Sequence, residues 1–253
     1  MLNWGPVIFG DQYANTRMRR ISIYILVVSF LTFSCQKILF DDDITTREIF
    51  FEDFNAVRIY GIYNIILVQD STDRLIITGS NDIRSVDATV ENDTLIIDDH
   101  KKMSFNPNKN RLVLHFSTLK YLETNDPVNI SNTDTIKADR FKYDGIGEIT
   151  EARLVIDCGQ LIVSNSANTL GYFHFIGRAE YCLLWNRYGS GMFADSLFCR
   201  DADIYTESIG PVNVNASDHI RAFIRGPGNI YYHGNPVIEI VEKKGEGKII
   251  QLD

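Results

Sequence analysis

Hydrophobic and polar residues alternate in short runs from residue 50 onward. Examples are Ala56–Tyr60, Tyr63–Val68, Arg74–Thr78 and Thr94–Ile97, which are rich in β-branched residues and separated by clusters of Asp, Asn and Gly. Runs of this kind predict β-strands joined by turns. Long helical periodicity is missing from the sequence, and the best helical candidate is one short stretch, Thr45–Phe54. The pattern therefore predicts an all-β protein.

The second half of the chain repeats glycine-centred turns, each followed by a short strand. Glycines at 159, 177, 191, 210, 228 and 247 are 18, 14, 19, 18 and 19 residues apart. A period near 20 is typical of a solenoid, in which stacked coils bury one continuous core. We expect coils of about 18–20 residues, with the N-terminal strands leading into the repeat. A β-sandwich is the alternative, since it also has strands at regular intervals; the near-constant spacing favours the solenoid, although the step of 14 does not fit it.

The glycines of these turns are expected at the corners of the coils. Corners need backbone conformations with positive φ, which glycine adopts without steric cost. The predicted turn glycines are Gly147, Gly159, Gly177, Gly191, Gly210, Gly228 and Gly247.

The N-terminal segment has the pattern of an export signal. Basic Arg19 and Arg20 precede an apolar run at 21–34, and Cys35 follows. Fourteen residues at a rise of about 1.5 Å are too short to cross a bilayer core of about 30 Å. Leu31 to Cys35 resembles a loose bacterial lipobox, which would place a lipid on Cys35. We expect a signal peptide at 1–34, with a start at Met18 as an open alternative, a lipid-anchored tether at 35–49 and the β-domain at 50–250. A mature N-terminal helix with a chance cysteine is the alternative.

Composition narrows the class of protein. The 253 residues carry a net charge of −8, and 45% of them are hydrophobic. This apolar fraction is too high for a disordered chain. The acidic balance argues against nucleic acid as a partner, because phosphate-binding surfaces need clustered Lys and Arg.

Three cysteines remain after Cys35, namely Cys158, Cys182 and Cys199, and all lie in or beside strand-like runs. We expect small core residues, since free cysteine behaves as a small hydrophobe. A Cys182–Cys199 bridge is the alternative, because 17 residues is close to one coil.

Catalytic and metal motifs are not visible in the sequence, and we expect no metal or cofactor. The five histidines, at 100, 115, 174, 219 and 233, form no HxH or HExxH arrangement. One acidic cluster supports an alternative function. Asp201 and Asp203 would share one face of a strand, and with Asp195 and Arg200 they could form the site of a carbohydrate-active enzyme, a polysaccharide lyase or hydrolase.

Aromatic residues gather between positions 172 and 232, on runs whose two faces both carry large apolar groups. Exposed Tyr and Trp side chains can stack on sugar rings or form a protein interface, and packing inside the molecule is the alternative. The candidate ligand-binding stripe comprises Tyr172, Tyr181, Trp185, Tyr188, Tyr205 and Tyr231.

Two segments resemble a known family, the auto-transporter adhesin head or GIN domain. Phe54–Val57 leads through Gly61 to Leu67–Asp70, and Gly226–Pro236 resembles the closing Gly-x-Gly-Asp-Val-Tyr-Tyr-x-Gly-x-Pro signature, with Asn229 where Asp is usual. The resemblance implies a right-handed parallel β-helix-like fold, export as an outer-membrane lipoprotein of a Gram-negative bacterium, on the periplasmic or surface side, and no catalytic residues. We expect a non-enzymatic binding or cell-envelope protein whose partner is a surface glycan or a protein, in contact with the membrane only through its lipid.

Overall fold

The structure is a computed structural model that describes residues 44–79, 85–99 and 111–252. The expected signal peptide and Cys35 lie outside these residues. All described strands belong to one compact unit, Asp43–Asp253. Within the described ranges there is no helix long and apolar enough to span a membrane. A fragment comprising residues 36–253 therefore contains every strand of the folded unit.

Nearly all of the described chain is strand, as predicted. Thr45–Phe54, the helical candidate, is wrong as a helix: Thr45–Phe50 is a strand paired antiparallel with Arg74–Gly79. Its β-branched residues suit a strand, and pairing satisfies its backbone groups. The strands are β1 Thr45–Phe50, β2 Ala56–Tyr60, β3 Tyr63–Gln69, β4 Arg74–Gly79, β5 Val86–Glu91, β6 Thr94–Asp99, β7 Arg111–Phe116, β8 Tyr121–Thr124, β9 Val128–Asn132, β10 Ile136–Gly145, β11 Ile149–Asn165, β12 Leu170–Tyr188, β13 Gly191–Ser208, β14 Val212–Ile224, β15 Ile230–His233, β16 Val237–Lys243 and β17 Ile249–Gln251.

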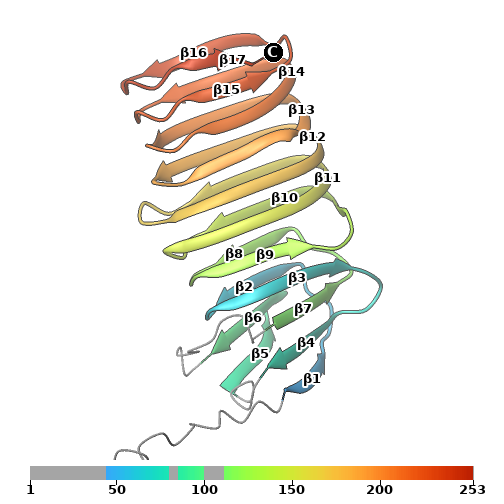
Figure 1. Cartoon of the computed structure of the whole chain (residues 1–253). Coiled ribbons are helices and arrows are strands. Elements are labelled where there is room, and N and C mark those ends of the chain that lie inside the picture. Colours follow the sequence, from blue (N-terminus) through green and yellow to red (C-terminus); the bar gives the residue numbers. More distant parts are fainter. Residues whose placement is uncertain (1–43, 80–84, 100–110, 253) are drawn as a thin grey trace, which may run out of the picture. The chain divides into compact units, whose positions relative to one another are not determined.

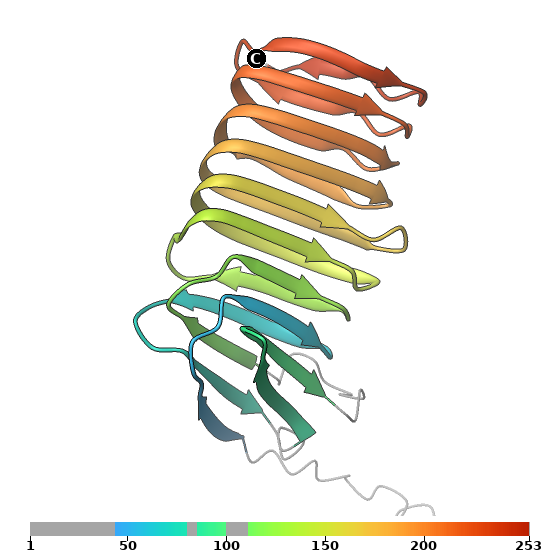
Figure 2. The ribbon, with the colours of Figure 1, turned by 180° about the vertical axis from the view of Figure 1, so that it is seen from behind.

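The strands stack into a β-solenoid with coils of about 20 residues, which confirms the predicted fold class (Figure 1). Each coil contributes to two parallel stacks. Stack 1 comprises β6, β2, β8, β10, the second halves of β11 to β14, and β16. Stack 2 comprises β7, β3, β9, the first halves of β11 to β14, β15 and β17. The long strands β11 to β14 bend in the middle, so each belongs to both stacks (Figure 2).

The N-terminal coils do not follow chain order. The coil of β2 and β3 lies between the coil of β6 and β7 and the coil of β8 and β9. Antiparallel strands β1, β4 and β5 then cover this end, because β4 pairs with β7 and β5 pairs with β6. Such a cap protects the edge strands of a solenoid from pairing with other chains.

The core is a set of columns of inward side chains in register from coil to coil. In stack 2 one buried column runs through paired positions on seven or more strands. Its members are Leu112, Ile65, Ile130, Ala152, Phe173, Met192, Val212 and Ile230. Because burial of one large apolar side chain stabilises a fold by about 1.5–3 kcal/mol, such columns supply the force that stacks the coils.

The turn glycines lie at two different edges of the solenoid. Gly159 and Gly177 lie at the bends within β11 and β12, whereas Gly147, Gly191, Gly210, Gly228 and Gly247 lie where stack 1 passes into stack 2. The step of 14 residues from Gly177 to Gly191 is thus a crossing from one edge to the other.

Close approach, rather than positive φ, explains most of these glycines. Of the seven, only Gly177 has positive φ, at 115°. A Cβ on Gly228 would collide with the carbonyl oxygen of Gly210 in the preceding coil, and a Cβ on Gly247 would collide with that of Gly228. The expectation of positive φ is therefore wrong for the other six.

Candidate ligand-binding face

The six residues of the predicted stripe do not lie on one face. Tyr181, Trp185 and Tyr205 point outward from stack 1 and are half-buried, and Tyr172 and Tyr231 lie on outward positions of stack 2. Tyr188 ends β12 with a φ of 61° and is exposed. The bend inside β12 separates Tyr172 from Tyr181, so residues on one strand face different sides. The structure therefore keeps half of the predicted stripe together.

Three aromatic side chains on neighbouring strands form a column on stack 1. Trp185 of β12 pairs with Tyr205 of β13, which pairs with Phe223 of β14. Ring centroids are 5.7 Å apart for Trp185 and Tyr205, and 4.1 Å apart for Tyr205 and Phe223. Phe223 was not among the predicted site residues; its spacing of 18 from Tyr205 is the signal that places it. We call these three residues the aromatic ladder.

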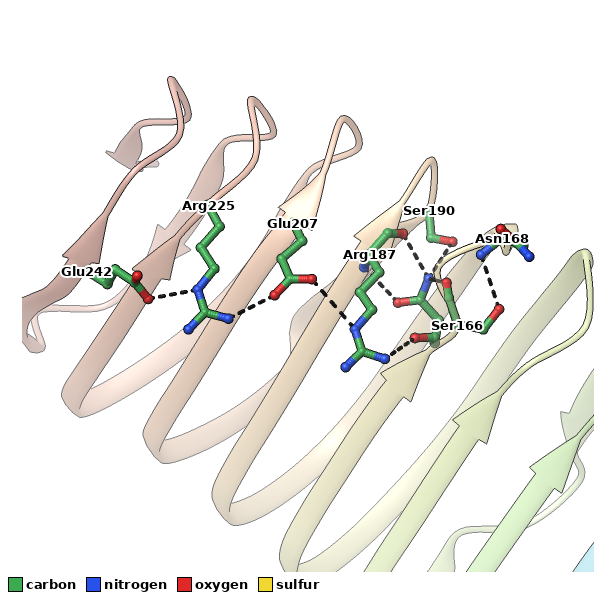
Figure 3. Close-up of polar contacts among 8 residues, drawn as sticks. Ser166, Asn168, Arg187, Ser190, Glu207, Arg225 and Glu242 are labelled. Atoms are coloured by element: carbon green, nitrogen blue, oxygen red, sulfur yellow. Dashed lines mark hydrogen bonds and ion pairs between the residues drawn. The ribbon is translucent and has the colours of Figure 1, made fainter.

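A line of alternating charges closes one side of the aromatic ladder (Figure 3). Arg187 lies 3.8 Å from Glu207, Glu207 accepts a hydrogen bond of 2.9 Å from Arg225, and Glu242 accepts one of 2.7 Å from Arg225. The guanidinium of Arg187 also lies 3.6 Å from the centre of the Trp185 ring. The charges hold successive coils in register and cover one face of the indole.

Polar amides fix the loop beyond this line. The Asn165 side chain accepts a hydrogen bond from the backbone N–H of Arg187 at 2.8 Å and donates to its carbonyl oxygen at 2.9 Å. It also donates to the Ser190 hydroxyl, which lies beside Ser166 and Asn168 in Figure 3. Because these groups are paired, the end of β12 is held firmly next to the aromatic ladder.

A polar pocket of about 330 Å³ lies on stack 1 on the other side of the aromatic ladder. Asp203, only 5% exposed, accepts a hydrogen bond of 2.9 Å from the Tyr181 hydroxyl and a bidentate pair from Arg221. Asp201 accepts hydrogen bonds from His219 at 2.8 Å and Arg200 at 2.9 Å. We call this hollow the polar pocket; its lining is Tyr181, Asp201, Ala202, Asp203, His219, Arg221, Val237 and Glu239.

The electrostatics of the polar pocket follow from these contacts. The hydrogen bonds from His219 and Arg200 lower the pKa of Asp201, so its carboxylate stays charged above its usual range. Burial, together with the bond to Asp203, raises the pKa of Tyr181 to about 12. Tyr181 is therefore a hydroxyl donor at ordinary pH. The pocket presents a ring, charged acceptors and guanidinium donors within one small volume, as sites for small polar ligands do.

The predicted acidic cluster does not assemble. Asp201 and Asp203 share one outward face, as strand alternation requires, and Arg200 contacts Asp201. Asp195 lies on the part of β13 before the bend, where its carboxylate contacts the Ser196 hydroxyl. The expected convergence of Asp195 with the other carboxylates is therefore wrong. Among the described residues, no group of three or more His, Cys, Asp or Glu is placed to hold a metal ion.

The three cysteines of the solenoid are buried and free, as expected for small core residues. Cys158 and Cys199 belong to one buried column at the inside of the bend, in which each alternates with an alanine. Little room exists on the inside of a bend, which accounts for the small side chains. The structure does not contain the alternative Cys182–Cys199 bridge.

Comparison with solved structures gives the same fold. A putative adhesin from Bacteroides fragilis superposes with a TM-score of 0.78 at 22% identity, covering 83% of this chain and 97% of that one. A putative lipid-binding protein from Parabacteroides distasonis gives 0.63 at 20% identity, with coverages of 83% and 97%. A putative adhesin from the same species gives 0.61 at 16% identity, with coverages of 84% and 98%. Among curated proteins, none matches the chain.

The family assignment rests on the sequence of the solenoid itself. The model of the family described as "Putative auto-transporter adhesin, head GIN domain" matches residues 53–236. The match begins just before β2 and ends just before β16, so it includes the capping strands β4 and β5, the aromatic ladder and most of the polar pocket. The chain therefore belongs to this family of adhesin head GIN domains.

Proposed function

We propose that the protein is an exported, lipid-anchored binding protein of the cell envelope, which takes a saccharide on the outward face of stack 1. The observation that carries the proposal is the position of the polar pocket beside the aromatic ladder. Family membership and the printed names of two structural neighbours, both putative adhesins, support a binding role rather than catalysis.

A saccharide fits the chemistry of this face better than an apolar ligand. Aromatic rings pack against the apolar faces of sugars, while carboxylate and guanidinium groups pair with their hydroxyls. The polar pocket is lined by Asp201, Asp203 and Arg221, which an acyl chain would leave without partners. At about 330 Å³ it is at the small end of ligand sites, with room for one or two sugar units.

Binding is tested with residues 36–253 on a glycan array, with and without calcium. Tyr181→Ala removes the ring of the polar pocket and should weaken binding to the saccharides that score, by about tenfold or more. Tyr172→Ala is the matched control, because it removes a 56% exposed tyrosine from stack 2. Equal losses in both variants, or an array without any saccharide bound, would reject the proposal.

The anchor is a separate part of the proposal and rests on the sequence at Leu31 to Cys35, outside the described residues. Its test is incorporation of radiolabelled palmitate by cells that express the whole chain. Labelling should be lost in Cys35→Ser and kept in Cys158→Ser. Retention of label in Cys35→Ser would remove the anchor and leave the binding face untouched.

A further inference from the structure

A second hollow, of about 720 Å³, runs across the bends of three neighbouring coils. Lys120 precedes β8, Lys137 and Arg140 belong to β10, and Asp157 and Gly159 belong to β11. We call it the basic groove. It lies on the edge at which β10 and β11 bend, away from the loops that carry Gly210 and Gly228.

The backbone around the basic groove is tied together by one side chain. The Gln69 amide donates to the carbonyl oxygens of Ser117 at 3.2 Å and of Lys137 at 3.0 Å. Its own oxygen accepts a hydrogen bond of 2.7 Å from the Lys137 N–H. The two walls that carry Lys120 and Lys137 are thus joined before any ligand arrives, which lowers the entropy cost of binding.

The cations of the basic groove are unpaired. Lys120, Lys137 and Arg140 are exposed and form no ion pair with any residue that the structure describes. Asp157 is engaged by Arg178, 3.3 Å away, so Asp139 is the one lining acid without such a partner among the described residues. Three free cations around one hollow are unexpected in a chain with 33 acidic and 25 basic residues. The groove is a local site for anions on an acidic protein.

The basic groove continues into the polar pocket along one row of paired residues. Arg140 pairs with Gln160, Gln160 with Tyr181, and Tyr181 with Asp201. Neighbouring strands are about 4.8 Å apart, so Arg140 and Tyr181 are separated by about 10 Å. That distance is about two sugar units, and one extended chain can reach both hollows.

We infer that the basic groove binds sulfate or phosphate esters on the saccharide whose neighbouring unit occupies the polar pocket. The inference rests on the proposed function and names the ligand class, an anionic polysaccharide. Cations that converge from three positions match the several oxygens of a tetrahedral oxyanion better than a planar carboxylate. Arg140 can donate two parallel hydrogen bonds, while the lysines act as point charges.

The experiment measures binding of residues 36–253 to dextran sulfate and to uncharged dextran by calorimetry. The test variant is K120Q/K137Q/R140Q. The matched control is R111Q/R153Q/K248Q, which removes the same charge from exposed cations elsewhere that also form no ion pair with described residues. Dextran sulfate should bind and dextran should bind much more weakly. The test variant should weaken binding of dextran sulfate by about tenfold or more, and the control by less than about threefold.

Equal losses in the two triple variants, or no binding of dextran sulfate by the unchanged protein, would overturn the inference. Competition by millimolar inorganic sulfate or phosphate, lost in the test variant, would support it and distinguish the ester from the polymer backbone. A single-stranded oligonucleotide of equal charge that competes as well as dextran sulfate would overturn the assignment to a saccharide. Tyr181→Ala separates the two proposals, since it acts on the polar pocket and should leave competition by the inorganic ions unchanged.

Discussion

The rings of Tyr205 and Phe223 stack with their centroids 4.1 Å apart and their planes 7° apart. The two residues are paired positions on adjacent parallel strands, so the spacing of the strands brings the rings face to face. This contact fixes part of the proposed binding surface before a ligand is present. It also means that ladder side chains contribute to stability as well as to binding.

The coupling between Tyr205 and Phe223 should be measurable. Tyr205→Ala and Phe223→Ala should each lower the free energy of unfolding by about 1–3 kcal/mol, less than for a fully buried aromatic. The double variant should show a coupling energy of about 0.5–1.5 kcal/mol in denaturant titrations. Tyr172→Ala combined with Phe223→Ala is the control and should be additive, because the residues lie on different stacks. Zero coupling for the first pair would contradict the stacked arrangement.

Two glycines predicted as equivalent should differ in their tolerance of a methyl group. A Cβ on Gly228 meets the backbone carbonyl of Gly210, which cannot move without shifting a coil. A Cβ on Gly191 meets the ring of Phe193 at 2.8 Å, and a half-buried side chain can rotate. Gly228→Ala should therefore cost about 2 kcal/mol or more, and Gly191→Ala clearly less, in thermal or chemical unfolding. Equal costs would show that the close approach at Gly228 is relieved easily.

The sequence predicted the solenoid because its period survives in the glycines, and it misjudged their role because period and conformation are separate properties. Spacing along the chain cannot distinguish two edges of one coil, so Gly177 and Gly191 looked like members of a single series. A contact with the carbonyl of the preceding coil, as at Gly228, depends on three-dimensional stacking and leaves no local signal.

The candidate site was predictable in part for the same reason. Side-chain alternation correctly placed Asp201 and Asp203 on one face of β13. The bends could not be located from the residues, so Tyr172 and Tyr181 were assigned to one surface and Asp195 to one cluster. The basic groove was missed altogether, because Lys120 and Arg140 are distant in sequence and become neighbours only through the order of the coils.

Stability should fall below about pH 4 through Asp70. Its carboxylate accepts hydrogen bonds from the Thr72 N–H at 2.7 Å and from His115 at 2.6 Å, and these contacts lower its pKa, the backbone bond most. A carboxyl whose pKa is lower in the folded protein stabilises it above the unfolded pKa of about 3.9, and loses this contribution as pH falls through the folded value. Asp70→Asn should therefore be less stable near neutral pH and lose less stability on acidification.

The measurement for Asp70 is chemical denaturation at a series of pH values from about 2 to 7. Asp53→Asn is the control, because Asp53 is exposed and has no partner among the described residues. Its curve should run parallel to that of the unchanged protein. A parallel curve for Asp70→Asn as well would show that this carboxylate does not contribute to acid unfolding.

The three thiols of the solenoid should be silent in the folded protein. Desolvation raises the pKa of Cys158 to about 12, and burial beside Cys199 raises that of Cys182 as well. Since the thiolate is the reactive form, on the order of one Cys158 thiol in ten thousand is ionised near pH 8. Residues 36–253 should therefore react very slowly with Ellman's reagent, and all three thiols should react at once in guanidinium chloride. One reactive thiol after unfolding would instead reveal a bridge between two of the cysteines, and fast reaction before unfolding would contradict the burial of the bend.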